Sequence, residues 1–229
     1  VEPEESQLTI SKGARQMRKH EDEAMLFIER LRQVYQNKGY VFFDKGDYNL
    51  NIIGVRNMTT GKADRFDDWI CLVYKINDRW VVDTYPATTE PGTSILKKPI
   101  VKGGTAILVP GQYRGVYKIG THGGKRRYTA LCQRLGKVKI WRDDNRDRTP
   151  DYDGEIHEGM YGINVHRQWG ADDREYTGGV SAGCQVFRSS KDFYQFMEIC
   201  HVAAEMYSNN FTYTLISDTD LEKTLDMCV

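Results

Sequence analysis

The spacing of apolar residues changes from a helical to a β-strand period near residue 39. Within Glu21–Asn37, apolar side chains recur at helical spacing, and Lys38-Gly39 supplies a helix stop. Beyond this point, alternation among β-branched and aromatic residues predicts strands. The predicted strands are Tyr40–Phe43, Asn49–Val55, Trp69–Ile76, Trp80–Tyr85, Thr105–Val109, Gly115–Ile119 and Lys137–Trp141.

Turn and capping residues add to this pattern. Asn77-Asp78 separates two predicted strands and is typical of a tight hairpin turn. Ser189-Ser190 can cap a second helix with one apolar face over Phe193–Tyr207, and a final strand is predicted over Thr212–Ile216. We therefore expect a β-rich α/β fold, with residues 1–39 as a helical N-terminal extension and residues 40–229 as one continuous domain.

The overall charge balance excludes some classes of function. Lys and Arg together number 32, as do Asp and Glu, and this zero balance argues against wholesale binding of nucleic acid. No apolar run is long enough for a membrane-spanning helix, and the first residues show no signal-peptide pattern. Within the chain, eleven Lys and Arg but three Asp lie between Arg114 and Arg148. This stretch is interpreted either as a solvated face or as the positive wall of a cleft for carboxylates.

The five cysteines suggest thiols rather than disulfides. Their number is odd, and no pair has the C-x-x-C spacing. Cys71 lies in a predicted strand and Cys200 on the apolar face of a predicted helix, so both are expected in the core. Cys132 and Cys228 have no visible partner. At least one thiol should remain free, and a free thiol can act as a nucleophile.

One stretch combines a thiol with a candidate base. The strand-like residues 162–165 lead to His166, and Ser181-Ala182-Gly183-Cys184 follows after fourteen intervening residues. An imidazole can activate a thiol, and a helix expected directly after Cys184 would favour the thiolate through its dipole. Gly183 permits a tight turn, so that the N–H groups of Gly183 and Cys184 could face a developing oxyanion.

This arrangement resembles the signature of the L,D-transpeptidase (YkuD-type) catalytic domain, in which a His precedes Ser/Thr-His-Gly-Cys. The pattern GINVHR…SAGCQVF looks most like the divergent branch found in phages and prophages, and residues 89–92 are similar to the family's Thr-Pro-x-Gly turn. The resemblance implies a β-sandwich with a helix after the nucleophile. It also implies that the chain binds peptidoglycan peptides and requires no cofactor. Such a protein would act in the bacterial envelope, in a virion or during lysis of the host cell.

Carried over by position, the resemblance assigns roles to individual residues. Cys184 would be the nucleophile and His166 its base. The Gly183 and Cys184 backbone would form the oxyanion hole, and Ser181 would help orient the imidazole through its backbone or its hydroxyl. Ala182 and Val186 replace a His and an Arg of the family motif. Four further residues are candidates for substrate binding: Arg188 and Arg167, which could replace the missing Arg, together with Tyr161 and His122.

Two functions from different classes follow from this stretch. The first is acyl transfer or hydrolysis on peptidoglycan stem peptides, with hydrolysis slightly favoured because the motif Arg is missing. The second is a non-catalytic structural or cell-wall-binding virion module on the same fold, in which Cys184 is simply a buried thiol. An enzyme should present Cys184 and His166 to each other in an open groove.

An acidic segment raises the question of a structural calcium ion. Asp143, Asn145, Asp147 and Asp151 match the first, third, fifth and ninth positions of a calcium loop, with Thr149 at the seventh. The turn glycine is replaced by Arg148, and the acidic twelfth ligand falls one place late. The segment is therefore interpreted as an ordinary acidic turn or as a weak calcium site.

Overall fold

The computed structural model describes residues 4–124, 127–170 and 174–226, without the side chains of residues 4–20 and 223–226. Eight strands close into a barrel in the order β1-β11-β5-β6-β9-β10-β3-β2, and a second sheet has the order β4-β7-β8. The barrel strands are β1 (Asn51–Arg56), β2 (Asp68–Ile76), β3 (Arg79–Thr88), β5 (Gly111–His122), β6 (Tyr128–Gln133), β9 (Val165–Arg167), β10 (Gln185–Phe187) and β11 (Phe211–Ser217). The other elements are β4 (Thr105–Leu108), β7 (Val138–Asp143), β8 (His157–Gly159), α1 (Glu4–Lys38), α2 (Thr93–Lys97), α3 (Ser190–Met206) and α4 (Asp218–Asp226).

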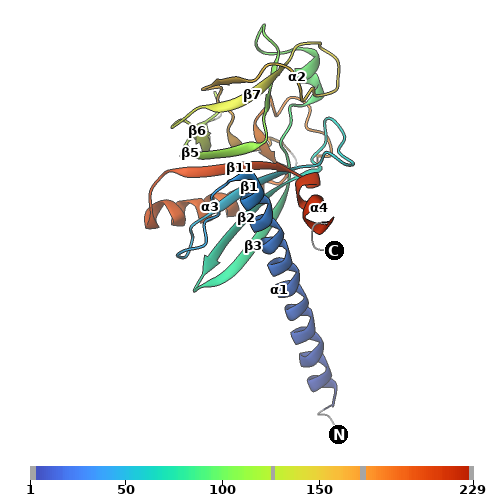
Figure 1. Ribbon diagram of the computed structural model, residues 1–229, viewed down its shortest axis with the longest axis vertical. Coiled ribbons are helices and arrows are strands. Elements are labelled where there is room, and N and C mark those ends of the chain that lie inside the picture. The colour runs from blue at the N-terminus through green and yellow to red at the C-terminus, as the bar shows by residue number, and fades with distance from the viewer. Residues whose placement is uncertain (1–3, 125–126, 171–173, 227–229) are drawn as a thin grey trace.

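The β-rich α/β character predicted from the sequence is confirmed, but the sheets are arranged differently from the expected β-sandwich. The barrel closes because β1 pairs in parallel with β11 and antiparallel with β2, while β10 pairs with both β9 and β3. Several of these pairings join segments that are far apart in the chain. The alternation of apolar and polar residues within one strand does not indicate which strand it pairs with. Figure 1 shows the small sheet and α2 above the barrel and α1 extending below it.

Short-range sequence patterns correctly predicted the hairpin between β2 and β3, but one strand predicted from them is absent from the described part of the chain. Asn77 and Asp78 both have positive φ, 50° and 61°, as the tight turn between β2 and β3 requires. The predicted strand Tyr40–Phe43 is wrong. There, the backbone of Val41 bonds to the side chain of Gln112 and that of Phe43 to the side chain of Asn51, so side chains replace a partner strand.

The N-terminal helix is longer than predicted. Its last turns pack Ile28, Leu31 and Tyr35 against the outward side chains of β1 and β2, including Ile53 and Val73. The predicted helix covered this packed part, but α1 begins at Glu4, well before the apolar stripe. A helix of this length spans about 50 Å, and its first half projects away from the barrel (Figure 1).

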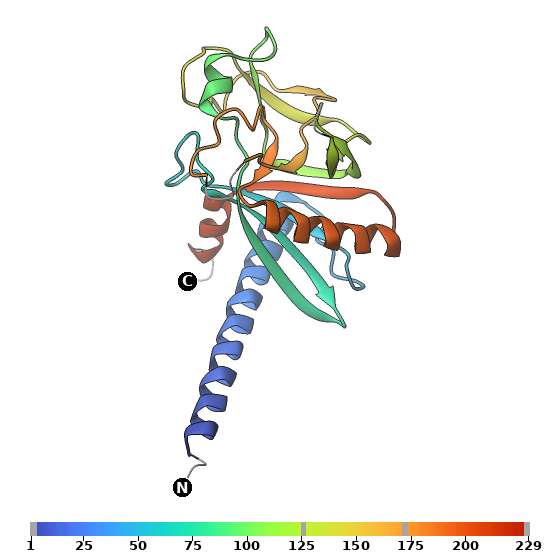
Figure 2. The ribbon, with the colours of Figure 1, turned by 180° about the vertical axis from the view of Figure 1, so that it is seen from behind.

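The helix predicted after Ser189 is confirmed and closes one side of the barrel. The Ser189 side chain accepts a hydrogen bond from the Asp192 N–H, and Phe193, Phe196 and Cys200 are buried in the core. Figure 2 shows this orange helix running beside β11. None of the helices that the structure describes combines the length and apolar character needed to cross a bilayer.

Candidate active site

Two short parallel strands bring the predicted thiol and imidazole to one face of the barrel wall. β9 and β10 pair with Val165 opposite Gln185 and His166 opposite Val186. Val165 and Phe187 point into the barrel core, so the alternating positions 164, 166 and 184 face outward. The Asn164 N–H lies 3.4 Å from the Cys184 Sγ, while Asn164 O accepts from the Gln185 N–H at 2.9 Å.

The hydrogen bonds of His166 fix its tautomer. Its Nδ1 lies 2.8 Å from the Arg167 carbonyl oxygen, which can only accept, so Nδ1 carries the proton and Nε2 has the free lone pair. The Tyr128 hydroxyl lies 3.2 Å from the same Nδ1 and donates to the same carbonyl oxygen. Burial, with a smaller contribution from His122, lowers the pKa of His166 to about 3. The imidazole is therefore neutral at pH 7 and able to accept a proton.

A second imidazole lies against the first. The rings of His122, at the end of β5, and His166 stack with centroids 4.1 Å apart. Asn164 Oδ1 accepts from the Gln133 N–H, so its amide nitrogen, 3.0 Å from His122 Nδ1, is the donor in that contact. Burial also lowers the pKa of His122. Sequence reasoning selected His122 but missed Asn164 and Tyr128. The period-two spacing of Asn164 from His166 was the available signal for the first.

The Cys184 thiol is half-buried and protonated in this structure. Its Sγ lies 3.5 Å from the Gly162 carbonyl oxygen, and burial raises the pKa of the thiol to about 11. Neither imidazole forms a hydrogen bond with this sulfur in the described chain. The expected helix dipole is also absent, because β10 follows Cys184 directly and α3 begins only at Ser190. That sequence-based expectation was wrong.

The Ser181–Cys184 segment is held by its own hydrogen bonds. Ser181 Oγ donates to the Cys184 carbonyl oxygen at 2.8 Å and accepts from the Gly183 N–H at 3.2 Å. The predicted role of Ser181 in orienting the imidazole is thus not what the hydroxyl does, and the Gly183 N–H is already bonded. By contrast, the Cys184 N–H has no acceptor among the described residues. It is the donor that remains for an oxyanion.

Gly183 is required at its position by two independent constraints. Its φ is +113°, a conformation that other residues rarely adopt. A Cβ at this position would also lie 2.3 Å from the carbonyl oxygen of Ala106 in β4. The backbone therefore passes so close to the small sheet that only glycine fits.

Three of the four predicted substrate-binding residues line two cavities, and among the described lining residues of either cavity there is neither Cys184 nor His166. One, of about 310 Å³, is lined by Tyr161, Arg142 and Ala182. The other, of about 560 Å³, is lined by His122 and Arg167 together with Tyr128, which contacts His166. The assignment of Arg188 to substrate binding is not supported. Its side chain donates to the Arg174 carbonyl oxygen and lines a separate cavity with Arg65, Asp67 and Glu175.

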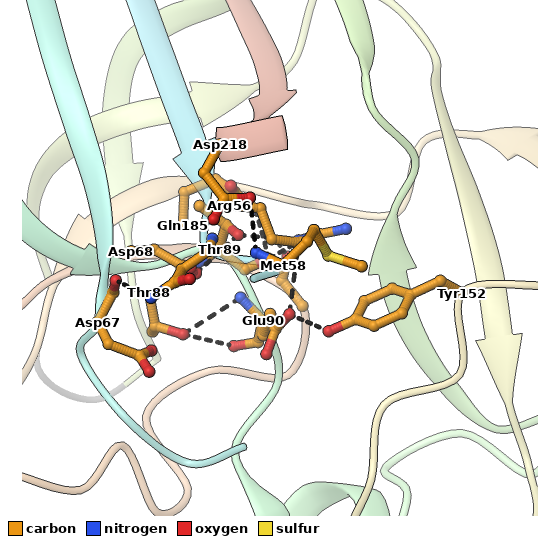
Figure 3. A network of polar contacts seen from close by, with 12 residues as sticks. Arg56, Met58, Asp67, Asp68, Thr88, Thr89, Glu90, Tyr152, Gln185 and Asp218 are labelled. Atoms are coloured by element: carbon orange, nitrogen blue, oxygen red, sulfur yellow. Dashed lines mark hydrogen bonds and ion pairs between the residues drawn. The ribbon is translucent and has the colours of Figure 1, made fainter. Parts of the chain in front are cut away.

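A buried network of charges supports the segment from the other side (Figure 3). Arg56, only 1% exposed, donates from Nε to Thr89 Oγ1 and from Nη2 to the Thr89 carbonyl oxygen. Asp68 accepts from the N–H and hydroxyl of Thr89, and Glu90 accepts from the Tyr152 hydroxyl. Burial, followed by the neighbouring Asp68, raises the pKa of Glu90 to about 7. Sequence patterns did not predict this network, because its members lie in four separate segments.

Gln185 joins this network to the Ser181–Cys184 segment. Its Nε2 donates to the carbonyl oxygens of Gly183 and Thr89, at 3.2 and 3.5 Å, and its Oε1 accepts from the Tyr213 hydroxyl. The Gly92 N–H donates to the Ser181 carbonyl oxygen at 3.0 Å. The turn at residues 89–92 therefore sets the position of the Ser181–Cys184 segment.

The acidic segment forms hydrogen bonds within itself. The Asn145 amide nitrogen donates to Asp147 and Asp151, and a carboxylate oxygen of Asp143 accepts from the Asp151 N–H. Burial and neighbouring carboxylates raise the pKa values of Asp143 and Asp151. No group of three or more His, Cys, Asp or Glu side chains in the described residues is arranged to hold a metal ion. Calcium binding here stays a prediction.

The remaining thiols behave as expected for a protein without disulfides. Cys71, Cys132 and Cys200 are free and buried, which confirms the core positions predicted for Cys71 and Cys200. Cys228 lies outside the described residues. No family model, no curated protein and no solved structure matches this chain, so geometry and sequence resemblance are the grounds for its function.

Proposed function

We propose that this chain is a cysteine-dependent enzyme that cleaves or transfers the acyl groups of peptidoglycan stem peptides, in the manner of L,D-transpeptidases. The observation that carries the proposal is the pairing of β9 with β10. It puts a neutral imidazole with a fixed tautomer on the same strand face as the half-buried Cys184 thiol, and the backbone N–H of Cys184 has no acceptor among the described residues. One cavity lined by Ala182, and another lined by Tyr128 and His122, which contact His166, offer space for peptide near these groups.

The protonation states of Cys184 and His166 before substrate binds determine the first step of the reaction. The thiol is neutral because its pKa is about 11, so thiolate amounts to roughly one molecule in ten thousand at pH 7. Attack therefore requires His166 Nε2 to take the thiol proton as the sulfur bonds to the peptide carbonyl carbon. Since no hydrogen bond joins the two groups at rest, substrate binding must turn the Cys184 side chain toward the imidazole.

The remaining steps use the same groups. The carbonyl electron pair moves to oxygen, and the Cys184 N–H donates to this oxyanion. Collapse of the intermediate breaks the C–N bond, and the leaving amine takes the proton from His166. A thioester remains on Cys184. Water or an amine then attacks the thioester carbonyl and gives its proton to His166. The C–S bond breaks, an acid or a new peptide is released, and the Cys184 sulfur takes the proton back from His166.

Two observations favour the alternative of a non-catalytic structural or cell-wall-binding virion module. The pKa of Cys184 is raised to about 11, and the sulfur bonds to backbone groups of residues 162 and 164 instead of to an imidazole. Reactive thiols generally have lowered pKa values. A module of this kind would bind cell wall without releasing peptides from it.

Incubation with purified peptidoglycan, followed by mass analysis of the soluble peptides, separates the two functions. The Cys184→Ser variant should release nothing. A matched control is Cys132→Ser, because the buried Cys132 thiol already donates to the Ala130 carbonyl oxygen at 3.7 Å, an acceptor that a hydroxyl can use. Peptide release by wild type and control alone supports the enzyme. Sedimentation with peptidoglycan without release, unchanged in Cys184→Ser, supports the binding module.

A further inference from the structure

Two arginines line the cavity beside the two imidazoles. Its lining includes Arg127 and Arg167 together with Tyr128, Trp169 and His122, and none of its lining residues within the described part of the chain is acidic. Neither guanidinium forms an ion pair within the part of the chain that the structure describes. Two cations in a cavity of about 560 Å³ form a site that attracts an anion.

Arg167 is held in place by aromatic rings and still has donors to offer. Its guanidinium lies over the ring of Tyr128 at 4.6 Å and near that of Tyr194 at 5.6 Å. Its Nη1 donates to the Gln168 carbonyl oxygen, while the buried Nε has no hydrogen-bond partner among the described residues. A guanidinium fixed in this way loses little freedom when it binds a carboxylate.

The cavity is also in direct contact with the proposed base. Tyr128 and His122 form its wall, and these same side chains contact the ring of His166. The carbonyl oxygen of Arg167 accepts a hydrogen bond from the Nδ1–H of His166. An anion bound to the Arg167 side chain would therefore lie next to the residue that carries the base.

We propose that this cavity is a carboxylate subsite, in which Arg127 and Arg167 hold a carboxylate group of the peptide beside Tyr128 and Trp169. This inference rests on the proposed function, since it names the chemistry of the peptide that the thiol attacks. Arg127 is exposed and guides the carboxylate in, whereas Arg167 is pre-oriented and fixes it.

Occupancy of the subsite would also prepare the base. Burial is the main cause of the lowered pKa of His166, and electrostatic interactions with the His122 ring and with the Arg167 guanidinium lower it further. The Tyr128 hydroxyl is a further titratable group that contacts its ring. A bound carboxylate offsets the charge of Arg167 and so raises the pKa of His166. The imidazole then becomes a stronger base only when a substrate of the right charge is present.

The test measures binding without turnover. The probes are N-acetyl-D-alanine and its amide, which differ only in the carboxylate, titrated into the Cys184→Ser protein and followed by the NMR signals of the histidine rings. The acid should bind at least tenfold more tightly than the amide. Arg167→Gln and Arg127→Gln should each weaken binding of the acid at least threefold and leave the amide unchanged. Equal binding of the two probes, or unchanged affinity in both variants, would overturn the subsite.

Two controls complete this experiment. Arg79→Gln alters an exposed arginine at the start of β3 and should change neither affinity. Arg167→Lys keeps the charge and should keep part of the preference for the acid, which shows that a loss in Arg167→Gln is not a folding defect. Saturation with the acid, and not the amide, should move the His166 titration to higher pH. Because no turnover is needed, acid binding by a protein that releases no peptide would refute the enzyme and leave the subsite standing.

Discussion

Two buried polar clusters lie on either side of the Ser181–Gln185 segment, and they differ in how their bonding capacity is used. In the network around Arg56, the guanidinium, the Asp68 carboxylate and Thr89 bond to one another. In the cluster around His166, the groups are uncharged, and no described hydrogen bond uses His166 Nε2 or the Cys184 N–H. The first cluster therefore fixes the segment, and the second is left able to react with something else.

The largest effect on peptide release should come from removing the Cys184 thiol, which no other group in the cluster can replace. Cys184→Ala should lower peptide release by roughly 10³-fold or more, because no other group in the cluster can form the acyl intermediate. Its melting temperature should stay within about 2 °C of wild type, since the thiol is only half-buried. Residual activity above one per cent would mean that the reactive cluster has been misidentified.

Disrupting the network around Arg56 should instead lower the free energy of unfolding. Arg56→Met removes the cation that forms an ion pair with Glu90 at 3.6 Å and that also interacts electrostatically with the buried Asp68, and losing one partner of a buried pair costs about 3–5 kcal/mol. Urea denaturation measures this loss. Adding Asp68→Asn removes one of the two carboxyl groups left without a cation and should recover part of it. If the single variant loses less than 1 kcal/mol, the network does not hold the segment.

Replacing the base should affect turnover more than the fold. His166→Gln should reduce kcat by roughly 10²-fold, with most of the stability retained because glutamine fills much of the buried space. Peptide release and a thermal melt are measured on the same sample. His201→Gln, at an exposed position on α3, is the matched control. A large loss of stability with full turnover would assign His166 to the core alone.

The Glu90 carboxyl predicts a smaller effect that depends on pH. Its folded pKa of about 7 lies above the unfolded value of 4.5, so the folded state binds this proton more tightly. The contribution to stability is full below pH 4.5 and is lost as pH rises to 7. Glu90→Gln, which keeps a neutral side chain, should therefore reduce the fall in melting temperature between pH 5 and 8. An identical fall in both proteins would contradict the raised pKa.

The smallest effect is expected outside both clusters, in the acidic segment. Millimolar calcium should raise the melting temperature by at most about 2–4 °C, because the glycine is missing, the acidic ligand is shifted and Asn145 already bonds to Asp147 and Asp151. Excess EGTA should reverse any such shift. A rise above 10 °C would reveal a tight calcium site that the present hydrogen bonds conceal.

The sequence predicted what depends on neighbours in the chain. The β2–β3 hairpin follows from Asn77-Asp78, and α3 from its Ser189 cap and apolar face. The motif also placed Cys184 and His166 in one neighbourhood. Each of these features is visible within a short window of residues.

Features that depend on long-range pairing were missed. Closure of the barrel needs the parallel pairing of β1 with β11, across more than half of the chain. The Arg56 network and the contact between Tyr128 and His166 arise only after that closure. Arg188 lines a different cavity from Arg167, because nearness to Cys184 in the sequence did not decide which cavity its side chain would enter.

The close approach of Gly183 to Ala106 sets unequal limits on change at adjacent positions. At residue 183, any side chain meets both an unfavourable φ and a carbonyl oxygen at 2.3 Å, so natural variation or engineering there disturbs the backbone next to Cys184. At residue 182, the alanine side chain lines the cavity of about 310 Å³ and has room to grow. Under the proposed function, selectivity for the peptide is therefore altered through position 182 while the backbone at 183 and 184 is inherited unchanged.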